Sequence, residues 1–334
     1  MKIGKDGTNF YIQGEGDPSC YPKFRQLIEM INKMGVPFSI GYTTGKGFDD
    51  PSIGHFLVDQ GLSSIVFSIF SVDPMLLRNY IHDPSPEVTL SVLEYLCGES
   101  EVFPNIILVP GVNDGDHLDE TCHWLEEKGA KGLIIFRFAN VEEQGIIRGN
   151  APIINNQRIH SITEFNDIVS NLSRKYNLRI DSMPLWDSKA QSPFIITYKP
   201  DYLDRLPRVF RQASIITGAI AAPYIQHILE TRGGSQKSVI PTKKDIACLI
   251  TIKDLKNIDL SLLEKTVIIP GRALVHDKEA KSVLCSDGVS RVIVRGPDTL
   301  TIDQMYWDIS RKDAIHDELA NFTALINLIN EYGV

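Results

Sequence analysis

Five polar or glycine-rich loops in the first 140 residues carry the side chains of this chain that could do chemistry. Each loop follows a short run of apolar residues. They begin near Gln13, Tyr42, Ser71, Pro110 and Ala139. Their glycines let a ligand approach the backbone, and their carboxylates can bind an amino group or a cation. These loops are therefore where we look for a ligand site.

The first loop reads Gly14-Glu15-Gly16-Asp17. It is not a dinucleotide-binding loop, because the third glycine is missing and two acidic side chains would repel a pyrophosphate. A carboxylate here can bind an amino group. The alternative is a tight turn in which Asp17 caps the helix that follows.

The second loop, from Gly41 to Gly47, contains Tyr42 and Lys46. It differs from a phosphate-binding loop, because one spacer residue is missing and Gly47 stands where Ser or Thr is required. Tyr42 lies at a strand tip and is placed to face a central ligand. The alternative is a flexible rim loop. In the Pro110 loop, Asn113 is either a ligand contact or part of a turn.

Elements of a parallel β/α barrel position these loops, because the carboxyl ends of its strands gather at one rim. Apolar runs alternate with amphipathic helical patterns from residue 8 to about 183. We expect strands at 8–13, 37–42, 63–70, 104–109, 132–138 and 178–182. No strand or helix pattern precedes residue 8, so we expect either an open arc or a barrel that lacks its first β/α unit.

The regular alternation of apolar runs and amphipathic helical patterns stops after residue 184. This change predicts two domains, 1–184 and 185–334. We expect residues 209–229 to be mainly helical and the rest to form a smaller α+β domain ending in a helix at 312–332. Its strands are expected at 246–252, 266–269, 273–276, 282–285 and 291–294.

The composition excludes several classes of protein. The net charge of −8 and the absence of a long basic run argue against nucleic acid as a partner. No apolar stretch reaches the roughly 18 residues of a membrane span. The first residues carry no leader pattern, so we expect a cytoplasmic protein. The five cysteines are dispersed, which predicts reduced thiols and no metal motif within the chain.

Taken together, the loops resemble those of the radical S-adenosylmethionine (SAM) superfamily over residues 8 to 183. The resemblance implies that Gly14, Glu15, Gly16 and Asp17 hold the methionine amino group. It also implies polar contacts to SAM from the residues on and after the fourth and fifth strands, and an adenine-side contact after the sixth. The residues at these positions are Ser68, Arg78, Asn113 and Ala139.

Residues 11–22, 41–47, 212–223 and 270–272 are similar to the methanogenesis marker protein ten family. Those enzymes are cobalamin-dependent and methylate an arginine carbon of methyl-coenzyme M reductase, drawing electrons from a reductant. The resemblance implies SAM, a 4Fe–4S cluster and a second domain that holds cobalamin. It makes Tyr42 a ligand of the open cluster iron and Leu249 a contact to the corrin. Leu249 has the alternative of being an ordinary core residue.

The chain departs from this family in one respect. The CxxxCxxC motif that holds the cluster is absent, and it would fall before residue 8. We therefore expect the chain to be the remainder of a longer protein. Two alternatives stay open. One is a cluster-free β/α-barrel lyase or aldolase using Lys46 or a carboxylate, and the other is a non-catalytic binding module. The sequence assigns no catalytic residue.

Overall fold

A computed structural model describes residues 2–3, 9–14, 16–144, 153–235, 238–303 and 309–334. The chain divides into two compact units. The first comprises residues 1–138 and 167–181, and the second comprises residues 139–166 and 182–334. The predicted boundary at residue 184 remains a prediction.

The first unit is built on a sheet whose strands follow one another in chain order. Strands β2 to β6 pair in parallel, and the short β1 pairs antiparallel with β2. This confirms the α/β fold class and the parallel sheet of a partial barrel. The strands are β1 (Lys2–Ile3), β2 (Phe10–Ile12), β3 (Phe38–Thr43), β4 (Leu62–Ser68), β5 (Glu101–Leu108), β6 (Gly132–Arg137) and β7 (Arg179–Met183).

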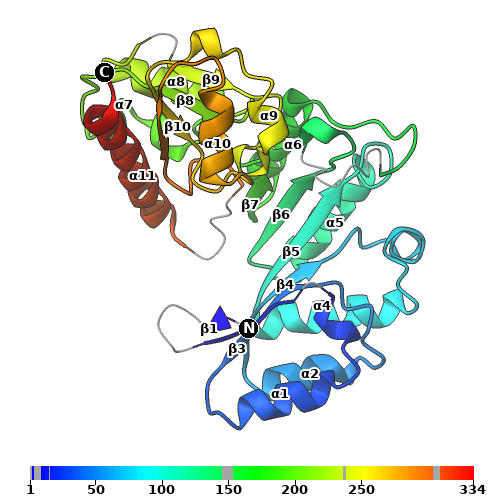
Figure 1. Ribbon diagram of the computed structural model, residues 1–334. Coiled ribbons are helices and arrows are strands. Elements are labelled where there is room, and N and C mark those ends of the chain that lie inside the picture. The colour runs from blue at the N-terminus through cyan, green and yellow to red at the C-terminus, as the bar shows by residue number, and fades with distance from the viewer. Residues whose placement is uncertain (1, 4–8, 15, 145–152, 236–237, 304–308) are drawn as a thin grey trace. The chain divides into compact units, whose positions relative to one another are not determined.

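Helices return the chain between these strands, and Figure 1 shows α1, α2 and α4 together on one side of them. The strand residues that face the helices, such as Ile65, Val102 and Ile135, are fully buried. The helical segments up to β7 are η1 (Pro18–Cys20), α1 (Phe24–Asn32), α2 (Ser52–Asp59), α3 (Pro74–Leu76), η2 (Leu77–Ile81), α4 (Pro86–Glu99), α5 (Asp116–Glu127), η3 (Glu142–Gln144) and α6 (Ile162–Lys175), of which η3 is counted with the second unit.

The second unit has its own sheet, in the order β11-β10-β8-β9, and every pair in it is parallel. Its strands are β8 (Ser214–Thr217), β9 (Val239–Pro241), β10 (Thr266–Ile269) and β11 (Val292–Arg295). Its helical segments are η4 (Ile195–Tyr198), α7 (Pro200–Asp204), α8 (Ala222–Thr231), η5 (Ala247–Leu249), α9 (Ile252–Leu255), η6 (Leu260–Leu262), α10 (Asp277–Leu284) and α11 (Arg311–Tyr332).

This parallel order makes the second unit α/β in character, where we expected α+β. The strands expected at 266–269 and 291–294 are confirmed. Residues 246–252 instead form η5 and the start of α9, and 282–285 lie mostly in α10. Residues 214–217, expected to be helical, form β8. Short apolar runs do not distinguish a buried strand from a buried helix, so periodicity gave the wrong secondary structure for these segments.

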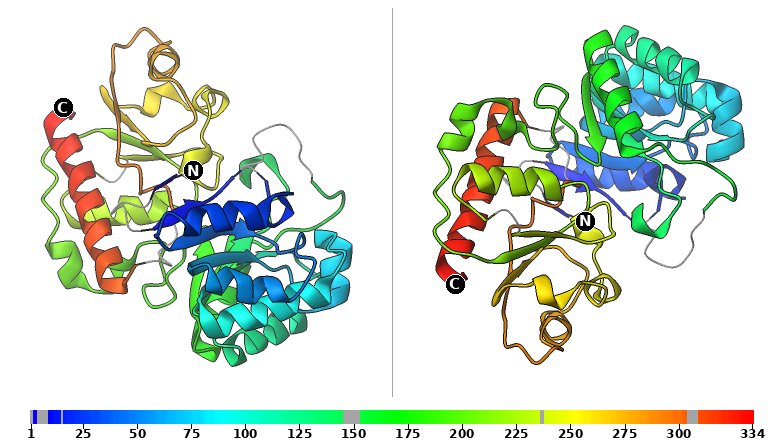
Figure 2. Two further views of the ribbon diagram at one scale, coloured as in Figure 1. Left: turned by 90° about the horizontal axis from the view of Figure 1, so that it is seen from below. Right: turned by 90° about the horizontal axis from the view of Figure 1, so that it is seen from above.

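Each face of the second sheet carries its own apolar core. Ile215 and Ile268 point to the face packed with α8 and α11. Ile216, Val267 and Ile269 point to the other face, where α10 packs. In the two views of Figure 2 the red helix α11 lies beside the yellow-green α8, and the orange α10 lies across the sheet from them. The arrangement is three layers, helix–sheet–helix.

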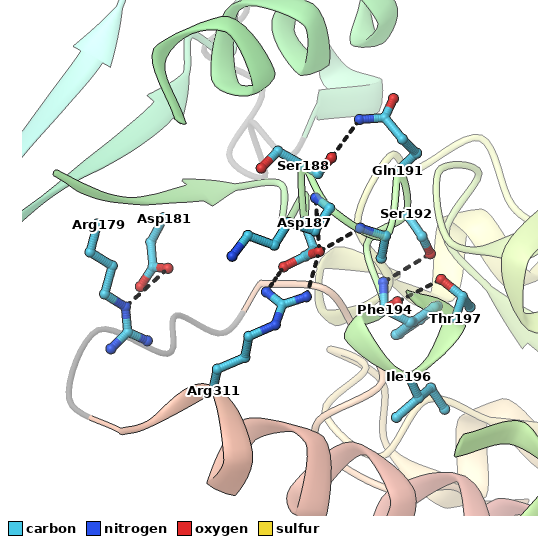
Figure 3. Close-up of polar contacts among 12 residues, drawn as sticks. Arg179, Asp181, Asp187, Ser188, Gln191, Ser192, Phe194, Ile196, Thr197 and Arg311 are labelled. Atoms are coloured by element: carbon cyan, nitrogen blue, oxygen red, sulfur yellow. Dashed lines mark hydrogen bonds and ion pairs between the residues drawn. The ribbon is translucent and has the colours of Figure 1, made fainter. Parts of the chain in front are cut away.

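A loop of the second unit is fastened to the start of α11 by one carboxylate. Asp187 accepts hydrogen bonds from the backbone N–H groups of Lys189 (3.1 Å) and Ala190 (2.6 Å). Its carboxylate also pairs with both terminal nitrogens of Arg311, as Figure 3 shows. The Asp187 side chain is only 12% exposed and that of Arg311 is 37% exposed, so the carboxylate of this ion pair is largely desolvated and the guanidinium is partly solvated.

Within the described residues no helix combines the length and the apolar content that crossing a membrane requires.

The ring of Phe322 in α11 is fully buried and meets Phe194 edge-on, with ring centroids 5.0 Å apart. We predict that Phe322→Ala lowers the free energy of unfolding by about 3–5 kcal/mol, because a large cavity replaces the ring. Urea denaturation followed by circular dichroism measures this. Phe210→Ala is the control, because that ring is 79% exposed. Equal midpoints for the two variants would contradict the packing described.

Candidate functional site

Asp17 joins the loop after β2 to the loop after β3. Its Oδ1 atom accepts hydrogen bonds from Ser19 N (3.0 Å), Ser19 Oγ (2.8 Å) and Thr43 Oγ1 (2.6 Å). Its Oδ2 atom accepts from Thr44 N (3.0 Å) and from Thr44 Oγ1. Burial disfavours the charged form, but the hydrogen bonds from Thr43, Thr44 and Ser19 outweigh it. The pKa of Asp17 is therefore below its usual range.

These bonds occupy the whole carboxylate of Asp17, because a carboxylate offers about four lone-pair positions. Asp17 also caps η1 through its bond from Ser19 N, which is the capping role expected as the alternative. Its visible role is to hold two strand-tip loops in one arrangement. A contact between Asp17 and a ligand stays a prediction.

Asn113 plays the same part between β4 and β5. Its Oδ1 atom accepts from Val109 N (2.7 Å), and its Nδ2 atom donates to Phe70 O (2.8 Å) and Ile107 O (2.9 Å). The side chain is 1% exposed. Both amide N–H groups are used, so Asn113 fixes the backbone at the carboxyl ends of two neighbouring strands.

The loop from Gly41 to Gly47 is packed closely against its surroundings. A Cβ atom on Gly47 would lie 2.2 Å from the carbonyl oxygen of Ser19. Gly45 has a φ of +74°, and a Cβ there would lie 2.5 Å from the Phe67 ring. Glycine is required at both positions, and the tip of this loop is set by its contacts with η1 and β4.

The face of the first sheet that points away from its helices carries the remaining polar groups at the strand tips. In a parallel pair, residues in register point to the same side. Ser68 is in register with Asn105, Asn105 with Ile134, and Ile107 with Phe136. The alternate residues, such as Ile106, face the helices. We call the face with Ser68, Asn105, Ile107 and Phe136 the inner face.

Tyr42 reaches this inner face from the tip of β3. Its ring centroid is 6.5 Å from that of Phe136, although β4 and β5 separate their strands. Tyr42 has a φ of +53°, a conformation that bulky residues rarely adopt. Burial, and secondarily the neighbouring Tyr11, raise the pKa of the Tyr42 phenol. The aromatic pair thus lies over the strand ends.

The structure places the other expected site residues as follows. Gly14 and Gly16 are exposed, and an added Cβ on Gly16 would meet nothing within 4 Å. Glu15 lies outside the described residues. The guanidinium of Arg78 pairs with both oxygens of Glu87 on the exposed surface, at 2.7 and 2.8 Å. Ala139 is half-buried and is counted with the second unit.

Leu249 is a half-buried residue that packs against the core of the second unit. This is the core role that the sequence left open as its alternative. It lies in the 3-10 turn η5 and not in a strand. Its contact with cobalamin stays a prediction.

Sequence reasoning missed Asn105, and it also missed Thr43 and Thr44 as the partners of Asp17. A signal for Asn105 was present. Buried parallel strands are usually apolar throughout, so an amide in the middle of Phe103–Leu108 is an anomaly. The threonines gave no such signal, because hydroxyls are ordinary in loops.

The cysteines do not gather into a metal site. Cys20 is exposed, Cys97 and Cys122 are buried, and Cys248 and Cys285 are half-buried. Burial raises the pKa of the Cys97 and Cys122 thiols to about 12. Among the described residues no three His, Cys, Asp or Glu side chains are grouped to hold a metal ion. The described part of the chain therefore does not fit an iron–sulfur cluster by itself.

Comparison with known proteins relates the first part of the chain to one superfamily. Residues 1–125 match the family model of the radical SAM superfamily. No curated protein matches the chain.

Several solved structures resemble it distantly. A domain of pyruvate-formate lyase-activating enzyme from Bacteroides vulgatus is 13% identical, and the match covers 52% of this chain and 96% of that domain (TM-score 0.39). SuiB from Streptococcus suis is 14% identical, with 52% and 39% covered (0.39). A radical SAM methyltransferase from Sphaerobacter thermophilus is 16% identical, with 52% and 50% covered (0.37). The chain spans half or less of the last two, and likeness at this level carries no argument about function.

We predict that Asp17→Asn lowers the free energy of unfolding at neutral pH by about 1–3 kcal/mol, because the amide cannot accept all the hydrogen bonds of the carboxylate. A carboxyl group whose pKa is lowered by folding stabilises the protein above its ordinary pKa of 3.8. This stabilisation is lost as the pH falls through the lower folded value.

The difference between wild type and Asp17→Asn should therefore be constant at neutral pH and shrink in acid below about pH 4. Urea unfolding at several pH values measures it. Asp49→Asn, which changes an exposed acid of the next loop, is the control. A difference that does not depend on pH would contradict the role given to the Asp17 charge.

Proposed function

We propose that the first unit binds S-adenosylmethionine on the inner face of its sheet, as part of a radical SAM methyltransferase. One observation carries the proposal. Side chains from β3, β4, β5 and β6 share that face: Tyr42, Ser68 and Phe136 lie near the strand ends, and Asn105 is in register with Ser68. The superfamily match over residues 1–125 supports it independently.

The residues divide into those that hold the loops and those that are open to a ligand. Asp17 and Asn113 hold loops, because their hydrogen-bonding atoms are used within the protein. Gly14 and Gly16 leave room for the methionyl end of SAM to approach the backbone. We keep Glu15 as the residue for its amino group and Ser68 as a contact to an oxygen of SAM.

Two expected contacts to SAM stay predictions with weaker support. Arg78 would have to leave its surface pair with Glu87, which is a modest cost for an exposed ion pair. Ala139 directly follows Phe138 in the chain, and we keep it as a residue near the adenine.

Radical SAM chemistry takes its electron from a 4Fe–4S cluster that cleaves SAM. The described residues supply no set of cysteines for it, so its main ligands are not among them. Tyr42 is the residue we propose near the open iron, because it lies on the inner face. The protein's own contribution would be to position SAM and keep water away from the aromatic pair.

We also propose cobalamin as a second cofactor. The second unit holds an open cavity of about 910 Å³, within the size range of organic ligand sites. Its lining includes Ala219, Pro223, Pro241 and Lys243, and Leu249 is not part of it. Cobalamin binding in the cavity and a cobalamin contact at Leu249 are therefore two proposals that have to be tested separately.

The substrate we propose is an arginine in a protein, and specifically in methyl-coenzyme M reductase. The motifs at residues 11–22 and 41–47 support this assignment. An acidic chain with a net charge of −8 also suits a cationic target side chain.

One observation favours a second function, a non-catalytic binding module. The polar residues at the strand tips were a reason to expect catalysis. Asp17 and Asn113, however, hold loops in place, and a non-catalytic scaffold would need such residues equally. Such a module would bind SAM without cleaving it. The structure adds no observation in favour of a lyase that uses Lys46.

We predict that Gly16→Val weakens SAM binding at least about tenfold while leaving the melting temperature unchanged. An added Cβ meets no protein atom within 4 Å and the position is exposed, so we expect folding to tolerate the side chain, which fills the space in which we place the ligand. Isothermal titration calorimetry on anaerobically purified protein measures the affinity.

Gly47→Val is the matched control. Its side chain would collide with the Ser19 carbonyl, so this variant should lose stability instead. An unchanged affinity for SAM in Gly16→Val would refute the placement of the ligand.

We further predict that deleting the gene in its source organism removes a methyl group from one arginine carbon of methyl-coenzyme M reductase. Peptide mass spectrometry of the isolated reductase measures the loss, and reintroducing the gene should restore it. A reductase with all its modifications intact after deletion would eliminate this substrate, and the SAM-binding proposal would stand on the calorimetry alone.

A further inference from the structure

Asn105 carries a buried amide group that nothing in the described structure satisfies. Its side chain is 5% exposed, and its Nδ2 atom has no hydrogen-bond partner. Asn113, eight residues further along the chain, is equally buried but uses both of its N–H groups. A buried donor without a partner destabilises a protein, so its presence requires an explanation.

The amide lies on the inner face, between the last residue of β4 and a residue in the interior of β6. Asn105 is in register with Ser68 on one side and with Ile134 on the other. Ile107, two residues further along β5 on the same face, is 51% exposed. The exposure rises toward the carboxyl end of the strand, which is where a ligand would enter.

The chemistry of the unpaired group limits what it can bind. An Asn side chain has two N–H donors on Nδ2, and in the orientation that the structure gives this amide they lack an oxygen acceptor. A guanidinium has only donors and cannot supply one. In this orientation the partner of Asn105 is an acceptor, and the guanidinium of an arginine does not fit. A ribose hydroxyl and a carboxylate both have the required oxygen.

We infer that Asn105 is a ligand-binding residue whose amide N–H donates to an oxygen of the sulfonium nucleoside, next to Ser68. This inference rests on the proposed function, because that function places SAM on the inner face. The unpaired donor in the free protein is the preorganised half of a hydrogen bond completed by the ligand. A polar residue kept at the expense of stability is typical of a binding site.

The test uses Asn105→Leu, which keeps the branching and the number of side-chain heavy atoms and removes the unpaired donor. We expect its melting temperature to rise by about 2–4 °C, because an unsatisfied polar group is replaced by an apolar one. Asn113→Leu is the matched control and should melt lower, because it leaves Phe70 O, Ile107 O and Val109 N without hydrogen-bond partners. An Asn105→Leu protein that melts lower, as Asn113→Leu does, would show a structural role and overturn the inference.

Calorimetry with SAM supplies the second readout. We expect binding to Asn105→Leu to be at least about tenfold weaker than to wild type, and Asn105→Ala serves as a second variant if the leucine does not fold. If wild type binds SAM and the variants bind it equally well, the inference about Asn105 is overturned and the proposed function is not. Wild type that does not bind SAM would overturn the proposed function as well.

Two analogues identify the oxygen. Decarboxylated SAM lacks the carboxylate, and 5′-methylthioadenosine lacks the whole amino-acid end. If the amide donates to the carboxylate, the variants should match wild type with both analogues. If it donates to the ribose, the tenfold loss should persist with both. Either pattern supports Asn105 as a ligand-binding residue, and the absence of any loss with SAM contradicts it.

Discussion

Side-chain hydrogen bonds between neighbouring loops are the constraint on which the first unit's site depends. The loops after the strands lie outside the regular ladder of backbone hydrogen bonds, so other groups are needed to fix them. Asp17 provides this between β2 and β3, and Asn113 provides it between β4 and β5. The glycines at 45 and 47 let the loops pack closely enough for these bonds to form.

In this arrangement the residues that hold the loops in place differ from those that are left to bind a ligand. A carboxylate or amide that fills its own hydrogen bonds inside the protein makes the loops rigid but leaves nothing for a ligand. The groups that remain are the open backbone at Gly14 and Gly16 and the unpaired amide of Asn105. Preorganisation of this kind reduces the ordering that a ligand must impose on the site when it binds.

The two units differ in how far sequence patterns predicted them. In the first, long apolar runs alternate with amphipathic helices, and the six expected strands are all present. In the second, strands of three or four residues are too short for periodicity to separate them from helical turns. Ser214–Thr217 was therefore assigned to a helix, and Ala247–Leu249 to a strand.

The sequence by itself determined the strands of the first sheet and the position of the loops that follow them, because both follow from patterns local to the chain. Only the tertiary structure decided which polar side chains near the strand tips use their hydrogen bonds within the protein and which have an unpaired group. That distinction depends on partners 26 to 43 residues away, such as Thr43 for Asp17 and Phe70 for Asn113. Hydrogen bonds over such separations are made by folding, and no local pattern encodes them.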